Sequence, residues 1–127
     1  MDDLIYQDDR CSYRISDPRF DPIGGNVIAA VSTGDFRVVG TNGEPVIWPI
    51  GSIRRLQVGR LAFFVTGGDY GIRFGVPDPN NVYPGGLSVE IGCRNEYYAR
   101  MLALKLGEVA RLDPEPTEEE RLGGLPF

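Results

Sequence analysis

The chain has 127 residues, a formal net charge of -5 and no histidine. A chain of this length is expected to form one domain that buries about two thirds of the surface exposed by its unfolded form. Histidine is the commonest general base and a frequent zinc ligand, so its absence argues against most hydrolase and metalloenzyme mechanisms. We therefore expect no catalytic activity, no cofactor and no bound metal.

The chain divides into three parts by composition. Residues 1–10 are polar and acidic, which predicts a flexible, frayed lead-in or a short lead-in strand. Residues 11–112 hold most of the apolar runs and are expected to form the domain. Residues 113–127 are rich in acidic residues and predict a disordered tail.

The first part of the domain has the composition of antiparallel β-structure. Short runs rich in β-branched and aromatic residues alternate with turn residues, among them an Asn-Gly pair. We expect about seven short strands, drawn from eight strand-like segments, 11–16, 26–32, 35–39, 45–50, 52–58, 61–67, 70–76 and 86–92. The segments 52–58 and 61–67, hinged at Gly59, are expected to pair, and the segment 77–86 is too rich in Pro, Gly and Asn to be regular.

The hydrophobic period changes near Asn95, which is a suitable helix N-cap. A broad helical stripe follows, made of Tyr97, Tyr98, Met101, Leu102, Leu104, Leu106 and Val109. Asp113 and Pro114 are expected to end the helix. Strands followed by one helix, without crossover helices, predict a mainly β fold, namely an antiparallel barrel or sandwich plugged by the C-terminal helix.

The negative charge is concentrated after this helix. Residues 113–127 contain five acidic residues and one arginine, a net of -4, so residues 1–112 total about -1. The basic residues of that body are eleven arginines and Lys105. Arginine suits bidentate capture of carboxylate or phosphate, although a compositional bias explains most of these arginines equally well. No Lys/Arg stripe with interleaved aromatics is present, so we expect no nucleic-acid partner.

The two cysteines, Cys11 and Cys93, are far apart and belong to no C-x-x-C motif. No signal peptide precedes them, so free, buried or half-buried thiols in a reduced cytoplasmic protein are favoured over a disulfide. No run approaches the roughly 18 to 20 apolar residues of a membrane span, so we expect a soluble protein.

The pair Arg54–Arg55 interrupts an apolar alternation. In a regular strand Ile53 and Arg55 would share one side, and Arg54, Leu56 and Val58 the other. One apolar set must therefore change faces at the pair, which a β-bulge or twist near Arg54 would allow. Exposed arginines that simply protect an edge strand from aggregation explain the pair equally well.

The stretch WPIGSIRRL, followed by AFFVTGG, GGLSVEIG and a helix of about eighteen residues, resembles a known family. It is similar to the phosphotyrosine-binding (PTB) domain of the insulin-receptor-substrate and docking-protein type, in the pleckstrin-homology-like superfold. The resemblance covers residues 26–112 and implies a barrel of about seven strands capped by the helix. It also implies a non-catalytic adaptor module in signalling, in which a peptide adds to the edge of the arginine-bearing strand.

Carried over to this sequence, the resemblance places a peptide between the Ser52–Val58 strand and the C-terminal helix. The residues that it assigns to peptide binding are Arg54, Arg55, Leu56, Tyr98, Met101 and Leu102. It makes Arg54 the first phosphate-binding arginine, but it puts Asp69 where the family has its second, and a carboxylate there would repel a phosphate. Arg73 or Arg60 could replace that second arginine, so peptide binding with and without phosphotyrosine both stay open.

The expected partner is a peptide segment of another protein, with or without tyrosine, in the cytoplasm or recruited through that partner to the inner face of the membrane. Two alternatives stay open. One is a structural or assembly subunit whose edge strand pairs permanently with a neighbour. The other is a phosphoinositide or membrane-surface binding module, which the near absence of lysine disfavours.

Overall fold

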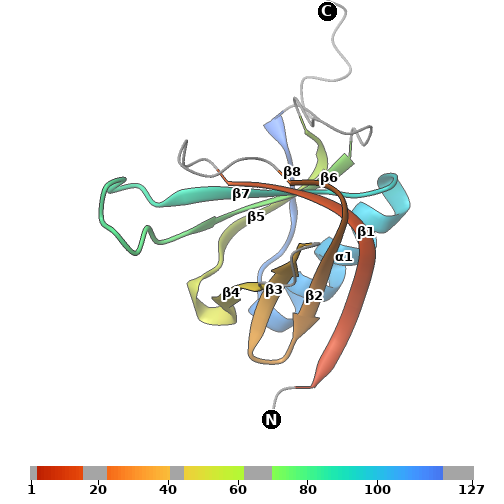
Figure 1. The fold of residues 1–127 in the computed structure, drawn as a ribbon, viewed down its shortest axis with the longest axis horizontal. Coiled ribbons are helices and arrows are strands. Elements are labelled where there is room, and N and C mark those ends of the chain that lie inside the picture. The colour runs from red at the N-terminus through yellow and green to blue at the C-terminus, as the bar shows by residue number, and fades with distance from the viewer. Residues whose placement is uncertain (1–2, 16–22, 41–44, 62–69, 119–127) are drawn as a thin grey trace, which may run out of the picture.

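The computed structural model describes residues 3–15, 23–40, 45–61 and 70–118, with the backbone alone for residues 23–26. Eight strands, one α-helix and one 3-10 turn follow each other along this part of the chain (Figure 1). They are β1 (Leu4–Ile15), β2 (Ile23–Ser32), β3 (Asp35–Val39), β4 (Pro45–Pro49), the 3-10 turn (Ile50–Ser52), β5 (Arg54–Arg60), β6 (Tyr70–Val76), β7 (Leu87–Gly92), α1 (Glu96–Ala110) and β8 (Glu115–Pro116).

The strands form a single sheet in the order β4-β3-β2-β1-β7-β6-β5-β8. Neighbouring strands are antiparallel except β5 and β8, which are parallel. The mainly β fold with a helix after the strands is therefore confirmed. Of the expected barrel or sandwich, the described residues do not form a closed barrel, because β4 and β8 are the two edges of an open sheet.

The core lies between α1 and the inner face of the bent sheet. The helix contacts β1, β2, β5 and β6 (Figure 1), and it begins where the Asn95 side chain accepts the N–H of Tyr98 at 3.1 Å, as expected of an N-cap. Phe74 packs edge-on against both Phe36 and Trp48, with ring centroids 5.4 and 5.6 Å away. Burial of each such aromatic side chain contributes about 1.5–3 kcal/mol to folding.

Both ends of the domain differ from the sequence-based division. Residues 4–10, expected to be a frayed lead-in or a short lead-in strand, are the first half of β1 and pair with β2. Asp8 within them is buried, because its carboxylate pairs with Arg94 far along the chain. At the other end, residues 115–116 pair with β5 and Thr117 is fully buried, so the tail begins as ordered structure.

The expected hairpin hinge at Gly59 is also wrong. β5 continues through Gly59 to Arg60 and pairs with β6. Most of the expected strand 61–67 lies outside the described residues, as does Asp69. Gly59 was interpreted as a turn residue, although a glycine within a strand can equally mark a place where two strands approach each other closely.

Cys11 and Cys93 are free and buried, as the sequence analysis favoured. The length and hydropathy of α1, the helix of the described chain, fall short of what crossing a bilayer requires. Trp48 is in the core, with 8% of its surface exposed.

Three glycines align across the sheet and allow its strands to pack closely. Gly59 of β5 pairs with Gly71 of β6, which pairs with Gly92 of β7. A Cβ atom on Gly71 would overlap the carbonyl oxygen of Ile91 and come within 2.7 Å of Leu61 Cδ1. A Cβ on Gly75, in the same strand, would meet its first neighbour at 3.6 Å.

We therefore expect Gly71→Ala to lower the free energy of unfolding by about 3 kcal/mol or more, since the neighbour is backbone and cannot rotate away. The control Gly75→Ala should change it by less than about 1 kcal/mol. Urea denaturation of both variants measures this difference. Equal stability of the two would contradict the β6–β7 register.

Candidate functional site

A β-bulge lies in the middle of β5. Arg54 pairs with Gly75 and Gln57 with Arg73, so two residues of β5 face a single residue of β6. Arg55 has a φ of 56°, in the left-handed region. The expected bulge is thus confirmed, and its extra residue is Arg55.

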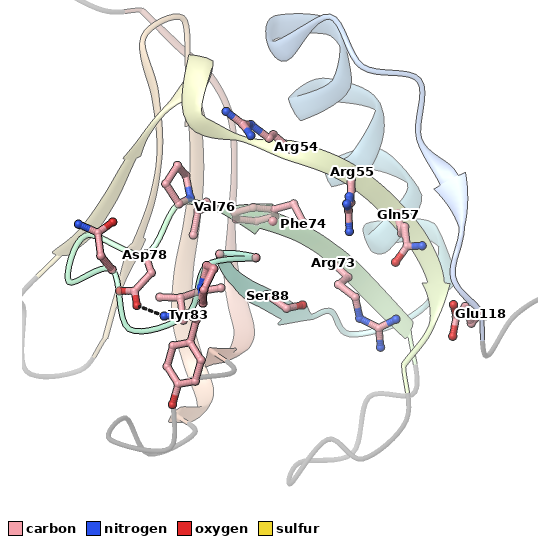
Figure 2. A pocket seen from close by; sticks show the side chains of 17 residues that line it. Arg54, Arg55, Gln57, Arg73, Phe74, Val76, Asp78, Tyr83, Ser88 and Glu118 are labelled. Carbon is pink, nitrogen blue, oxygen red and sulfur yellow. Dashed lines mark hydrogen bonds between the residues drawn. The ribbon is translucent and has the colours of Figure 1, made fainter.

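The bulge sends both arginines to the same side of the strand. Leu56 turns into the core with 2% of its surface exposed, whereas Arg54 and Arg55 are both exposed. Both arginines line a pocket of about 740 Å³ on the face of β5, β6 and β7 that points away from α1 (Figure 2). In Figure 2 the Arg55 side chain points from β5 into the pocket, whereas the Arg54 side chain runs back toward the start of the strand.

The loop between β6 and β7 forms one wall of this pocket, and Asp78 holds it in place. The Asp78 carboxylate accepts the backbone N–H groups of Asn80, Val82 and Tyr83 at 2.8–3.0 Å (Figure 2). Asp78 itself is 6% exposed. The sequence predicted an irregular loop, but it did not predict that Asp78 would hold the loop in place. An aspartate followed by Pro-Asn-Asn does favour a turn in which the Asp side chain accepts backbone N–H groups of the next residues.

A charged row crosses the same face of the sheet. Glu90 of β7 lies between Arg73 of β6 and Arg14 of β1, and each arginine approaches the carboxylate to 2.7 Å. Glu90 is 4% exposed, so water is largely excluded from its carboxylate. The two arginines compensate the buried negative charge in place of water. Arg73 therefore lines the pocket with its guanidinium already bound to Glu90.

Arg54 and Arg55 differ from Arg73 in this respect. Within the described residues neither has a salt bridge or a side-chain hydrogen bond. The two acidic residues that line the pocket are Asp78, used by its loop, and Glu118 beyond β8. The pocket therefore presents two exposed cations that could bind a carboxylate or phosphate.

The second edge of β5 is partly covered by the chain itself. Glu115 and Pro116 of β8 lie opposite Gln57 and Val58. The N–H of Thr117 donates to the Val58 carbonyl at 3.3 Å, and its hydroxyl donates to the Arg60 carbonyl. This is the edge that the family resemblance assigned to a peptide.

The six residues assigned to peptide binding do not form one surface. Leu56 and Leu102 are in the core, with 2% and 0% of their surface exposed, so they support the groove but cannot touch a peptide.

The other four residues lie on two different surfaces. Arg54 and Arg55 line the outer pocket, whereas Tyr98 and Met101 are half-buried on α1. The Arg94 guanidinium lies 3.6 Å from the centre of the Tyr98 ring and covers one face of it. The phosphate candidates Arg54 and Arg73 do line one pocket.

No protein-family model and no curated protein sequence matches the chain. Among solved structures, it is similar to one chain of "The 8S snRNP Assembly Intermediate", with a TM-score of 0.65 and 12% sequence identity. The alignment covers 91% of this chain and 87% of that chain. A likeness at this identity shows a shared fold.

The pocket wall should depend on the Asp78 carboxylate. Asp78→Ala removes three charge-assisted hydrogen bonds to backbone N–H groups, and we expect it to lower the free energy of unfolding by about 1–3 kcal/mol. It should also speed hydrogen exchange at Val82 and Tyr83. Asn80→Ala, at an exposed position of the same loop, is the matched control. Unchanged exchange at Val82 and Tyr83 in Asp78→Ala would show that the loop is held by other contacts.

Proposed function

We propose that this chain is a non-catalytic interaction module that binds an extended segment of a partner protein by strand addition along β5. The observation that carries the proposal is the position of residues 115–117, which already occupy this edge as an added strand. An edge that accepts one extended segment offers the same main-chain donors and acceptors to another.

The chain's own segment indicates what such a ligand would look like. It is extended and acidic, it contains prolines, and it inserts the Thr117 side chain with 0% exposure. A longer added strand would continue past Gln57 toward Leu56 and Arg54, where the described chain places no strand partner on this edge. Arg54 and Arg55 would then favour a carboxylate or phosphate on the ligand.

The internal strand is short enough for a partner to displace it. Its pairing with β5 covers two residues, and the N–H and hydroxyl of Thr117 donate hydrogen bonds just beyond it. Each such bond contributes about 0.5–1.5 kcal/mol net. A partner that pairs over more residues of β5 would therefore compete with the tail.

Composition and the pocket support the non-catalytic part of the proposal. The chain contains no histidine, and the pocket presents arginines rather than a nucleophile beside a base. The two free buried thiols fit a reducing, cytoplasmic setting. A permanent assembly partner could pair with the same edge of β5. The experiment below distinguishes such a partner from a ligand that binds reversibly.

The proposal predicts that opening the edge increases peptide binding. Thr117→Arg puts a charge where no surface is exposed and should expel residues 115–117 from β5. A labelled synthetic peptide with the sequence of residues 112–120 should then bind at least about tenfold more tightly to this variant than to the unchanged chain, because its internal competitor is gone. Asp113→Asn, at an exposed position before β8, is the control.

Nuclear magnetic resonance identifies the binding surface in the same titration. Amides of residues 54–60 should shift when the peptide binds to Thr117→Arg. Shifts confined to the chain termini, or none, would reject strand addition at β5. A Thr117→Arg chain that elutes as a stable oligomer without peptide would instead favour the permanent assembly partner.

Paired peptides decide whether phosphate matters. Tyrosine-containing turn peptides, phosphorylated and not, are titrated into the Thr117→Arg chain with and without Arg54→Ala. If Arg54 binds phosphate, its loss should weaken the phosphorylated peptide alone. Equal weakening of both peptides would assign Arg54 a structural role in β5.

A further inference from the structure

A buried cluster of potential metal ligands lies where β1 meets the start of α1. Ser12 of β1 pairs with Gly92 of β7, so the next residues outward, Cys11 and Cys93, lie side by side. Asp8 precedes Cys11 by three residues across a shift in the β1–β2 register. The two sulfur atoms and a carboxylate oxygen of Asp8 all lie within 4.8 Å of one another.

One polar atom of this cluster has no partner. Asp8 Oδ1 accepts the backbone N–H of Arg10 and a guanidinium N–H of Arg94, both at 3.2 Å. Asp8 Oδ2 is buried and makes no hydrogen bond within the described residues. Asp8, Cys11 and Cys93 are 2%, 1% and 3% exposed. A buried carboxylate oxygen left without a partner is costly, which points to a group that is not part of the chain.

We propose that Asp8, Cys11 and Cys93 form a binding site for a thiophilic divalent cation, with Zn²⁺ as the physiological ion. Thiolate ligands select zinc over magnesium and calcium, and a carboxylate oxygen is an accepted third ligand. Zn–S distances of about 2.3 Å and Zn–O distances of about 2.0–2.2 Å put tetrahedral ligands about 3.4–3.8 Å apart. The three side chains would need to close by about 1 Å.

The charges balance in both states. Without metal, two neutral thiols accompany the Asp8 carboxylate and the Arg94 guanidinium, for a sum of zero. With Zn²⁺, both thiol protons are released, and two thiolates and one carboxylate meet the ion and the same arginine, again for a sum of zero. The cation therefore adds no uncompensated charge to a buried site. Arg94 stays in place because it also lies over the Tyr98 ring.

A redox role for the two thiols is the less favoured use of the cluster. A disulfide between the two cysteines would leave the buried Asp8 Oδ2 without a partner, whereas a bound cation would give it one. The ion would join β1 to the residues just before α1, as structural zinc sites join separate elements, and this role is independent of peptide binding at β5.

No motif in the sequence indicates this site, and we expected no metal from it. Cys11 and Cys93 are separated by most of the domain, and metal-binding spacings in sequence are short. The β1–β7 register brings the cysteines together, and the side of β1 on which Asp8 lies depends on the irregularity between Asp8 and Cys11.

Zinc binding by the full chain tests the proposal. The reduced, chelator-treated protein is titrated with Zn²⁺ against a chromophoric zinc indicator, and we expect one ion per chain. Asp8→Asn and Cys93→Ser should each weaken binding by about 100-fold or more. Asp9→Asn, at the exposed next position, is the matched control and should bind as the unchanged chain does. Failure to compete with the indicator, or unchanged binding by Asp8→Asn and Cys93→Ser, overturns the site.

Cobalt substitution of the unchanged chain gives a readout that needs no variant to fold. Co²⁺ held by two thiolates should show sulfur-to-metal charge-transfer absorption, together with the visible bands of tetrahedral cobalt. Added Zn²⁺ should abolish both and raise the melting temperature of the chain. Octahedral cobalt bands without charge transfer would show that the cysteines do not bind the ion, and would overturn the proposal.

Discussion

The burial of Ile53, which directly precedes β5, together with two apolar residues of β5 is the constraint that shapes the candidate site. Ile53, Leu56 and Val58 are 5%, 2% and 7% exposed, although the spacing from 53 to 56 does not fit a regular strand. The left-handed backbone of Arg55 costs about 1–2 kcal/mol. Burial of Leu56 contributes about 1.5–3 kcal/mol, so the bulge is favoured. Its consequence is that two adjacent arginines share the outer face.

The same strand therefore connects two surfaces. One is the arginine pocket over β5, β6 and β7, whose loop wall depends on Asp78. The other is the edge toward α1, where residues 115–117 pair in parallel with Gln57 and Val58. A ligand strand longer than this segment would run along the edge and come near the bulge. Occupation of the edge and the chemistry of the pocket are then coupled through one short strand.

The sequence predicted the features that depend on neighbours along the chain. The bulge follows from the apolar phase around Arg54, the helix start from Asn95, and the irregular loop from its composition. It did not predict features that depend on distant partners. Asp8 was placed in a flexible segment because its pairing with Arg94 joins residues that are far apart in sequence. The pairing of the acidic tail with β5 was missed because main-chain hydrogen bonds leave no mark on residue type.

Arginine content alone could not distinguish the arginines that stabilise the fold from those available to a ligand. Arg73 binds the buried carboxylate of Glu90, and Arg94 binds that of Asp8. Removing either arginine would leave a buried carboxylate with less compensation, which typically costs several kcal/mol. Arg54 and Arg55 have no such carboxylate among the described residues, so replacing them should affect binding more than folding. The buried acids thus identify, by elimination, which arginines of the pocket have no carboxylate bound to them among the described residues.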